Sequence, residues 1–487
     1  MRQSHQTKKR YYRRHKRAPS NYKKYNTDLC NDDMTFEDCE IAILRHAVDE
    51  TEKIQGEEIA NNQDVVRIIQ ILEHFIASKK LLCYGGTAIN NILPKEAQFY
   101  NRDIEVPDYD FFSSNALADA KELADIFYKA GFKETEAKSG VHVGTFKVFV
   151  NFMPIADITS MNMQLYHNIF KESIQIDGIH YAPPNYLRMS VYLELSRPMG
   201  DVSRWEKVMK RLNLLNKYYP LVADNCHTID FQRKMDETPE TKSENLYIVV
   251  RDSFIDQGVI FFGGYATSLY SRYMPAENQR IVEKIPDFDV LSEDIDKCAT
   301  IVKERLHEKG IHNVRLIKHA TIGEIIPEHI EIRVGKETIA FVYRPNACHS
   351  YNSIKIDGKD IHVATIDTIL AFYLAFIYAD YYSYYRERIL CMAKFLFEVE
   401  EKNRLNQVGL LKRFSINCYG EQETLTMVRN KKTSKYRELL NKPNDAEYET
   451  WFLKYSPSDA AAPQARGRNK TYKRRATPKA ASGDFLI

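Results

Sequence analysis

The sequence lacks the features of membrane, secreted and zinc-binding proteins. The longest apolar run, residues 369–379, is shorter than the roughly 20 residues that span a bilayer. The basic N-terminus has no apolar stretch of the kind that a signal peptide needs. The eight cysteines form no Cys-x-x-Cys pair and no Cys/His cluster at zinc spacing. We therefore expect no membrane anchor, no structural zinc, and reduced cysteines in a reducing compartment.

Several common catalytic signatures are also missing. The chain has no Walker A loop, no His-Glu-x-x-His, no Gly-x-Ser-x-Gly and no dinucleotide-type Gly-x-Gly-x-x-Gly. What is present is a chain of 487 residues with 44% hydrophobic and 12% aromatic residues, which is long enough for two or three domains with real cores. That composition excludes a wholly disordered protein.

The net charge of +3 conceals two basic ends around an acidic body. Residues 1–24 carry ten Lys and Arg and no acid, and residues 456–487 carry seven Lys and Arg and two acids. The residues in between carry 52 basic and 64 acidic side chains. Basic arms indicate a polyanionic partner such as nucleic acid, although a solvated or targeting tail has the same composition.

The middle of the chain contains one α/β pattern twice. The order is a helical stretch, a short apolar strand, a Gly-Gly pair, a Pro-Asp-aromatic-Asp segment, a serine, and a helix that ends at glycine. In the first copy these features fall at residues 65–78, 81–84, 85–86, 107–110, 113 and 115–131, and in the second at 246–256, 259–262, 263–264, 286–289, 292 and 294–310. The offset is 178 residues at the Gly-Gly pair and 179 at the Asp pairs, the serine and the final glycine, and we therefore predict an internal duplication of one α/β unit.

The glycine pair of the first copy suits a phosphate site. Gly85 and Gly86 come directly after a strand, and glycines let the backbone approach phosphate oxygens closely. A helix that begins after Thr87 would direct free N–H groups at those oxygens. Taken alone, a Gly-Gly turn is most often only a turn, so the prediction of a phosphate site depends on the acidic residues further along the chain.

Three carboxylates complete the pattern. Residues two apart on a strand face the same side, so Asp108 and Asp110 converge on one point while Tyr109 faces the core. Two carboxylates can hold Mg²⁺, which keeps waters and substrate phosphates as its other ligands. Asp157 comes after a strand of alternating character at 146–152 and is the candidate third carboxylate of a two-metal site.

With these residues in order, the chain resembles the polymerase-β-type nucleotidyltransferase superfamily. The pattern of that superfamily is Gly-Gly or Gly-Ser, an acid pair flanked by apolar residues, and a third acid. More narrowly, the chain resembles the poly(A) polymerase catalytic subunit of large cytoplasmic DNA viruses, the poxvirus and giant-virus group. The similar segments are 84–90, 107–113 and 186–220, within a resemblance that covers about residues 60–420.

The resemblance implies template-independent polyadenylation of mRNA 3′ ends. The 3′-hydroxyl of RNA would attack the α-phosphate of ATP and release pyrophosphate, with Mg²⁺ or Mn²⁺ as cofactor, and Asp157 would help to activate the hydroxyl. The site residues that it implies are Asp108, Asp110 and Asp157 for the metals and Gly85, Gly86 and Thr87 for the triphosphate. It further implies a homodimer or a viral processivity subunit as partner, no membrane, and a location in the cytoplasmic viral factory of the host and in the virion.

A basic helix is expected after the third acid. Residues 201–218 have helical spacing, and Arg204, Lys207 and Arg211 share one face. In polymerases of the resembling type a basic residue on such a helix meets the triphosphate, so we expect Lys207 first and Lys210 second in that role. A solvated basic face has the same spacing.

The second copy keeps part of the pattern. It retains Gly264, Asp287 and Asp289, but Tyr265 stands where the first copy has a threonine, and a bulky ring there would obstruct a phosphate pocket. At an offset of 180 the third acid corresponds to Glu337, which lies between a lysine and a threonine rather than between apolar residues. We expect the second copy to be catalytically silent, with its acids retained for folding, a weak metal site or RNA contact.

The sequence thus predicts an α/β (α+β) fold with two tandem nucleotidyltransferase-like units, each a small mixed sheet with flanking helices. The expected divisions are a flexible basic tail at 1–35, a catalytic domain at 36–220, a linker at 221–240, a second domain at 241–420, a helical segment at 421–455 and a basic disordered tail at 456–487.

Two other functions fit the same residues. Another nucleotidyltransferase, adding CTP, UTP or a single AMP to RNA, protein or a small molecule, would need the same carboxylates, because pocket shape rather than spacing decides the base. A non-catalytic RNA-binding scaffold with two dead units is a further alternative, against which the complete acid set of the first copy argues.

Overall fold

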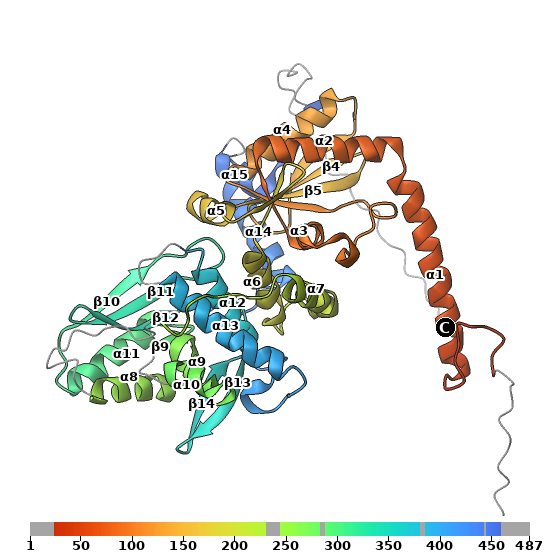
Figure 1. Ribbon diagram of the computed structural model, residues 1–487. Coiled ribbons are helices and arrows are strands. Elements are labelled where there is room, and N and C mark those ends of the chain that lie inside the picture. Colours follow the sequence, from red (N-terminus) through yellow and green to blue (C-terminus); the bar gives the residue numbers. More distant parts are fainter. Residues whose placement is uncertain (1–23, 230–243, 283–287, 380–384, 443–444, 459–487) are drawn as a thin grey trace, which may run out of the picture. The chain divides into compact units, whose positions relative to one another are not determined.

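The computed structural model describes residues 24–229, 244–282, 288–379, 385–442 and 445–458 (Figure 1). The chain divides into two compact units: Met1–Arg67 with Tyr100–Val106, and Ile68–Phe99 with Pro107–Ile487. The predicted tails lie largely outside the described residues, as do residues 230–240 of the predicted linker. The predicted division at residue 220 therefore stays a prediction.

The described part of the first unit consists mainly of the helix α1 (Phe36–Ala60). Thr35 caps this helix through a reciprocal pair of hydrogen bonds with Asp38, a capping box that satisfies two otherwise unpaired N–H groups. A disulfide between Cys30 and Cys39 ties the preceding turn to the first part of the helix. Gly56 lies against the backbone of residue 104, too close for any larger side chain.

The first sheet of the second unit has eight strands in the order β16-β3-β4-β5-β2-β1-β7-β6. Pairing is antiparallel except for β1 with β7 and β2 with β5. The strands are β1 (Leu82–Tyr84), β2 (Tyr109–Ser113), β3 (Thr135–Ser139), β4 (Thr145–Val150), β5 (Met153–Ser160), β6 (Ile174–Ile176), β7 (Ile179–Tyr181) and β16 (Lys454–Tyr455).

The second sheet repeats seven of these strands in the same order, β10-β11-β12-β9-β8-β14-β13, with β15 added at its end. Its two parallel pairs, β8 with β14 and β9 with β12, stand where those of the first sheet do. The strands are β8 (Ile260–Phe262), β9 (Phe288–Leu291), β10 (Val314–His319), β11 (His329–Val334), β12 (Glu337–Tyr343), β13 (His349–Ile356), β14 (Lys359–Ala364) and β15 (Cys418–Tyr419). The predicted duplication and fold class are confirmed.

Amphipathic helices cover the sheets and form the core. On α4 (Ala116–Lys129) the buried residues Ala116, Ala120, Leu123, Ala124 and Phe127 recur at helical spacing and pack on β3 and β4. The matching helix of the second repeat, α11 (Ile295–Glu308), packs on β10, β11 and β12. The remaining helices are α2 (Gln63–Lys79), α3 (Gly85–Ile92), α5 (Met163–Phe170), α8 (Glu244–Asp256), α9 (Gly263–Tyr270), α10 (Ala276–Val282), α14 (Leu425–Leu439) and α15 (Ala446–Phe452).

Each repeat ends in two helices, and these helices join the repeats. The helices α6 (Pro184–Leu195) and α7 (Trp205–Tyr218) come after the first sheet, and α12 (Ile366–Phe376) and α13 (Arg386–Lys402) come after β14 of the second. α6 packs on α12, as Figure 1 shows, and each also packs on the next helix along the chain. The apolar run of residues 369–379 lies mostly in α12, which ends at Phe376, and α13 begins at Arg386.

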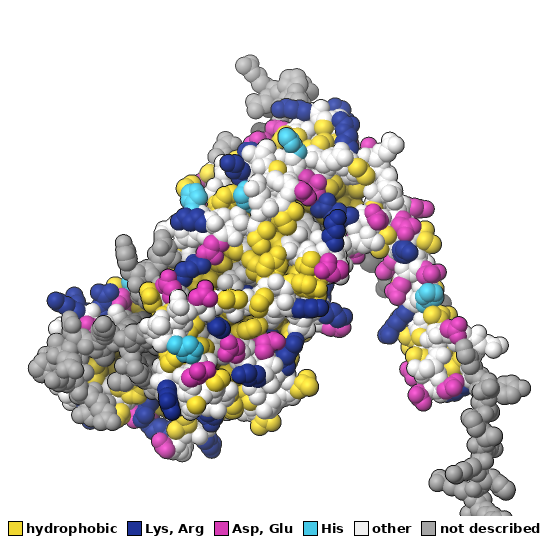
Figure 2. All heavy atoms as spheres, viewed as in Figure 1, with side chains coloured by type: hydrophobic (Ala, Val, Ile, Leu, Met, Phe, Trp, Pro, Cys, Tyr) yellow, Lys and Arg dark blue, Asp and Glu magenta, His cyan; other side chains and the backbone are white. Residues whose placement is uncertain are grey.

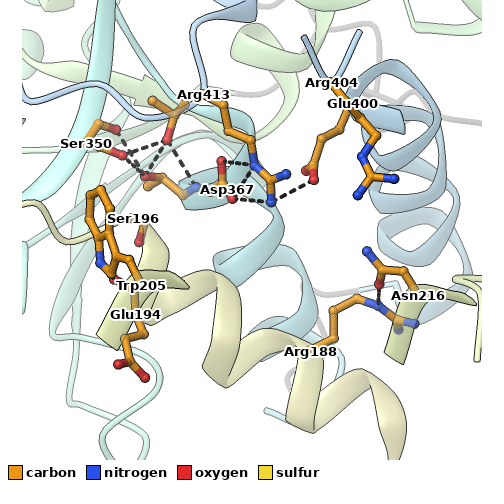
Figure 3. A network of polar contacts seen from close by, with 12 residues as sticks. Arg188, Glu194, Ser196, Trp205, Asn216, Ser350, Asp367, Glu400, Arg404 and Arg413 are labelled. Atoms are coloured by element: carbon orange, nitrogen blue, oxygen red, sulfur yellow. Dashed lines mark hydrogen bonds and ion pairs between the residues drawn. The ribbon is translucent and has the colours of Figure 1, made fainter. Parts of the chain in front are cut away.

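A buried ion-pair network lies beside these helices (Figure 3). The Arg413 guanidinium lies 2.8 Å from Asp367 Oδ1 and 2.8 Å from Glu400 Oε1, and all three side chains are at most 6% exposed. Burial raises the pKa of Glu400, and the charge of Arg413 opposes that rise. One arginine thereby ties α12 and α13 to the segment that comes after them.

The expectation of reduced cysteines is wrong for six of the eight. Besides the disulfide of the first unit, Cys226 pairs with Cys391 and Cys348 with Cys418, while Cys83 and Cys298 are free and buried. The partners are 165 and 70 residues apart in sequence, yet their Cα atoms lie 5.5 and 5.1 Å apart. Spacing along the chain carries no sign of such pairs.

Charged side chains of both signs are interspersed over the face shown in Figure 2, and hydrophobic side chains gather near the middle of that view. None of the helices within the described ranges combines the length and apolar character that crossing a membrane requires.

Candidate active site

A glycine turn brings the backbone of the first repeat against a carboxylate. Gly85 comes directly after β1 with φ of +73°, and a Cβ added there would lie 2.5 Å from Asp110 Oδ2. Both facts favour glycine, because L-residues rarely adopt this φ and nothing larger fits. The helix α3 begins at Gly85 rather than after Thr87, and the residue that precedes it makes no side-chain cap. Its first N–H groups are therefore suited to an anion.

The three predicted carboxylates are brought together by strand pairing. Asp110 on β2 lies directly opposite Asp157 on the parallel strand β5. Asp108 precedes Asp110 by two residues and so lies on the same face. Tyr109 faces the other way, is fully buried, and donates a hydrogen bond of 2.5 Å to Glu73. The predicted alternation is thus confirmed.

Negative charge is crowded at this point of the sheet. Burial, and then the charges of Asp108 and Asp157, raise the pKa of Asp110 to about 7. Burial and the charge of Asp157 also raise the pKa of Asp108, while Lys147 and Lys207 oppose that rise. A cation would relieve this repulsion.

Thr87 holds the backbone of the site through a hydrogen bond. Its side chain is 4% exposed, and its hydroxyl donates a 2.5 Å hydrogen bond to the carbonyl of Asp108. This bond fixes the backbone from which the first carboxylate projects. The predicted contact of Thr87 with a triphosphate stays a prediction, as do those of Gly85 and Gly86.

Sequence reasoning missed one residue of the site. Lys147 on β4 lies directly opposite Asp157, and its Nζ is 2.5 Å from Asp157 Oδ2. The only signal was a single charged residue within the alternating strand 145–150, which is equally typical of any half-exposed strand.

The basic helix reaches the site through some of its predicted residues. The pKa values of Asp108 and Asp110 are raised chiefly by burial, and the charges of Lys207 and Arg204 respectively oppose that rise. Lys210, the second choice from the sequence, instead forms an exposed ion pair with Glu206 at 2.8 Å. Lys207 is therefore the better candidate for a triphosphate contact, with Arg204 beside it.

The donor set fits a divalent oxygen-loving cation. As the side chains stand, no group of three or more Asp, Glu, His or Cys residues within the described part of the chain lies ready to hold a metal. Mg²⁺ needs only one or two carboxylates when substrate phosphates supply further oxygens. Asp108 and Asp110 can supply them, while Asp157 is held by Lys147. The predicted three-carboxylate ligand set stays a prediction.

The second repeat has the turn without the third acid. Gly263 has φ of +72° and lies against Asp289 as Gly85 lies against Asp110. In the parallel pair β9 with β12, however, the residue opposite Asp289 is Phe341. Glu337 pairs with Val334 at the start of β12 and is therefore not the counterpart that the offset suggested. Asp287 lies outside the described residues.

Tyr265 does not obstruct a phosphate pocket as expected. It is 7% exposed and packs against Phe261 and Phe288, with ring centroids 4.8 and 5.4 Å away. The tyrosine fills the core of the second repeat, so having Tyr265 at the position of Thr87 changes the packing of the core.

Comparisons with known proteins agree with this geometry. The family model of the poly(A) polymerase catalytic subunit matches residues 70–201. A putative poly(A) polymerase catalytic subunit of African swine fever virus is 34% identical over 168 residues, which are 33% of this chain and 35% of the relative. The mimivirus protein of the same description is 29% identical over 218 residues, 42% of this chain and 35% of the relative. The alignments thus span about a third of the length of these relatives.

The fold extends further than the sequence similarity. The crystal structure of the Megavirus polyadenylate synthase superposes with a TM-score of 0.71 at 19% identity, covering 91% of this chain and 88% of that one. The chain therefore has the fold of a solved polyadenylate synthase and, over its carboxylate-bearing region, a sequence similar to viral poly(A) polymerase catalytic subunits, which confirms the resemblance predicted from the sequence.

Proposed function

We propose that this protein is a polynucleotide adenylyltransferase that adds adenylate to the 3′ ends of mRNA without a template. The observation that carries the proposal is the register of Asp110 opposite Asp157, with the Gly85 turn packed against Asp110. That arrangement supports the proposal because the N–H groups at the start of α3 lie beside acidic groups that can hold metal. Its absence from the second repeat supports one active site rather than two.

In the proposed reaction the 3′-oxygen of the acceptor RNA forms a bond to the α-phosphorus of ATP. The bond from that phosphorus to the oxygen bridging to the β-phosphate breaks, pyrophosphate leaves, and the hydroxyl proton passes to solvent by way of Asp157. A divalent ion, Mg²⁺ or Mn²⁺, when held by Asp108 and Asp110, supplies charge stabilisation to the phosphates. Asp157 accepts a hydrogen bond from the acceptor hydroxyl and so orients it for attack.

The basic groups act on the other side of the triphosphate. Gly86 and the first N–H groups of α3 bind phosphate oxygens. Lys207 and Arg204 balance the charge that develops on the departing pyrophosphate. The partners in this proposal are ATP and an RNA 3′ end, with self-association or a second viral subunit as the source of processivity, and the setting is the cytoplasm of the host.

An extension assay tests the proposal. The full-length protein is mixed with a short labelled RNA and Mg²⁺ or Mn²⁺, and ATP, CTP, GTP and UTP are offered separately. We expect long ladders with ATP only, none with the Asp108→Asn/Asp110→Asn variant, and normal ladders with Asp289→Asn as the matched control. Extension with CTP or UTP instead would make the protein a different nucleotidyltransferase, and no extension with any nucleotide would overturn the proposal.

A further inference from the structure

Five charged side chains lie in one row across the first sheet. Asp110 on β2 is opposite Asp157 on β5, Asp157 is opposite Lys147 on β4, Lys147 is opposite Lys138 on β3, and Lys138 is opposite Lys454 on the edge strand β16. Residues directly opposite one another in a sheet project from the same face. Lys147 and Lys138, the lysines nearest the acids, therefore continue the line of the carboxylates away from the triphosphate side, where Gly85 and the helix α7 lie.

The lysines are on the side of the sheet opposite to the core. Ala137 and Val148, their neighbours along β3 and β4, are fully buried. Lys138 is 41% and Lys147 38% exposed, so both reach solvent from the face that bears the acids. The Lys138 Nζ lies 5.3 Å from the centroid of the Phe149 ring and also contacts Glu136.

The second sheet supplies an internal comparison. Its corresponding row runs from Asp289 through Phe341 and Glu331 to Ile317. Phe341 thus replaces the third acid, Glu331 replaces Lys147, and Ile317 replaces Lys138. The loss of Lys147 follows from the loss of its ion-pair partner Asp157. Lys138 contacts Glu136 and Phe149 rather than the third acid, so its absence from the second sheet is the more informative difference.

We propose that Lys138 and Lys147 form the binding site for the backbone of the acceptor strand, receiving the phosphates that precede its 3′-terminal hydroxyl. The proposal rests on the proposed function and deepens it, because it assigns the side on which the acceptor enters. It concerns the described first sheet and is independent of the basic tails.

The spacing suits a nucleic acid strand. Neighbouring strands are about 4.8 Å apart, so Lys138 is about 10 Å from Asp157, and a stacked strand rises about 3.4 Å per nucleotide. An acceptor with its 3′-hydroxyl at Asp157 would lay its last two or three phosphates along the row. Lys147 is paired with Asp157 in the structure. Each of the two lysines uses one of its three ammonium donors on a carboxylate, Lys147 on Asp157 and Lys138 on Glu136, and can donate the other two to phosphate oxygens.

Salt dependence of binding tests the proposal without any turnover. A labelled single-stranded oligoribonucleotide is titrated with the full-length protein at fixed millimolar Mg²⁺ and no ATP, over a range of salt concentrations. Each phosphate contact contributes about 0.7 to the slope of log K against log salt for single strands. We expect Lys138→Gln to lower the slope by about 0.7 and the double variant with Lys147→Gln by about 1.4. These losses correspond to about fivefold and about 25-fold weaker binding at 0.1 M salt.

Two controls separate charge from folding. Lys318→Gln removes an exposed lysine from β10, the counterpart of β3 in the second sheet, and should leave the slope unchanged. The charge-preserving Lys138→Arg/Lys147→Arg variant should restore binding. Unchanged slopes in the glutamine variants, or a loss of binding that arginine does not rescue, would overturn the proposal.

The extension assay run in parallel keeps this test distinct from that of the proposed function. If the wild-type protein extends RNA but the glutamine variants keep the wild-type salt slope, only the proposed lysine site is rejected. If the variants have a reduced salt slope but the wild-type protein does not extend RNA, the lysines are supported as a nucleic-acid site and the polymerase activity is rejected. In the steady state Lys138→Gln should raise KM for RNA about fivefold while KM for ATP and kcat stay within twofold; an equal rise in KM for ATP would argue against an acceptor site.

Discussion

The two glycine turns allow one perturbation to be made twice in the same molecule. Gly85 and Gly263 have φ values of +73° and +72°, and each lies against an aspartate. Replacing either by alanine puts an L-residue into the left-handed region, at a cost of about 1–2 kcal/mol. At roughly 2–4 °C per kcal/mol, each variant should lower the melting temperature by a few degrees.

The two variants should differ in activity. A Cβ at residue 85 would lie 2.5 Å from Asp110 Oδ2, so this carboxylate must move by about 0.9 Å to restore ordinary contact at 3.4 Å. A misplacement of about 1 Å in a catalytic group costs on the order of 10²-fold. We expect Gly85→Ala to lower kcat for adenylate addition about 100-fold. Gly263→Ala, whose Cβ would lie only 2.1 Å from Asp289 Oδ2, should leave kcat unchanged.

The assay combines thermal unfolding with single-nucleotide addition at saturating ATP, well below the lower melting temperature. Equal losses of activity in the two variants would refute the assignment of catalysis to the first repeat. Full activity in Gly85→Ala, at the expected loss of stability, would refute the claim that the turn positions Asp110.

Three further predictions concern the acids and the core. Asp110→Asn should lower kcat/KM about 10³-fold, because a metal-binding carboxylate contributes several kcal/mol of transition-state stabilisation and each 1.36 kcal/mol is a factor of ten. The matched variant Asp289→Asn should keep kcat/KM within threefold of the wild type. In urea titrations Arg413→Met should lower the free energy of unfolding by about 3–5 kcal/mol, since Asp367 is left buried without its counter-charge, and a loss below 1 kcal/mol would contradict this. Burial lowers the pKa of His349 to about 3, so between pH 6.5 and pH 3 only the unfolded state takes up a proton on this histidine. The free energy of unfolding should therefore decrease as the pH is lowered through this range, by up to about 1.4 kcal/mol per pH unit. His349→Gln should remove that part of the slope, and equal slopes in denaturation at pH 4 to 7 would contradict it.

The sequence predicted the features that depend on local order. The duplication was visible because the same residue types recur at a nearly constant offset, and strand periodicity sufficed to put Asp108 and Asp110 on one face. Both results depend on neighbours along the chain and need no knowledge of which strands pair.

Features that depend on pairing could not be predicted. A constant offset of 180 made Glu337 the counterpart of Asp157, but hydrogen bonding puts Phe341 there, four residues later. The loops between strands differ in length between the copies, and only the register reveals the shift. Lys147 was missed for the same reason, since its importance comes from the strand beside it.

The pairings of cysteines and of buried charges are likewise long-range. Cys226 meets Cys391 across 165 residues, and Arg413 meets Asp367 across 46. The end of α12 at Phe376 has no sign in the sequence either, since the apolar run continues to residue 379 and no proline follows the helix.

The turn that survives in the second repeat shows which part of the motif belongs to the fold. Because the Gly263 backbone passes so close to Asp289, glycine is required there whether or not any nucleotide binds. A Gly-Gly pair with an aspartate further along the chain is therefore a signature of this strand-turn-helix geometry and by itself no sign of catalysis. What distinguishes the first repeat is the row beyond the turn, in which Asp157 and two lysines stand where the second has Phe341, Glu331 and Ile317. In a duplicated chain of this kind, activity should be assigned from the residues that face the turn across the sheet.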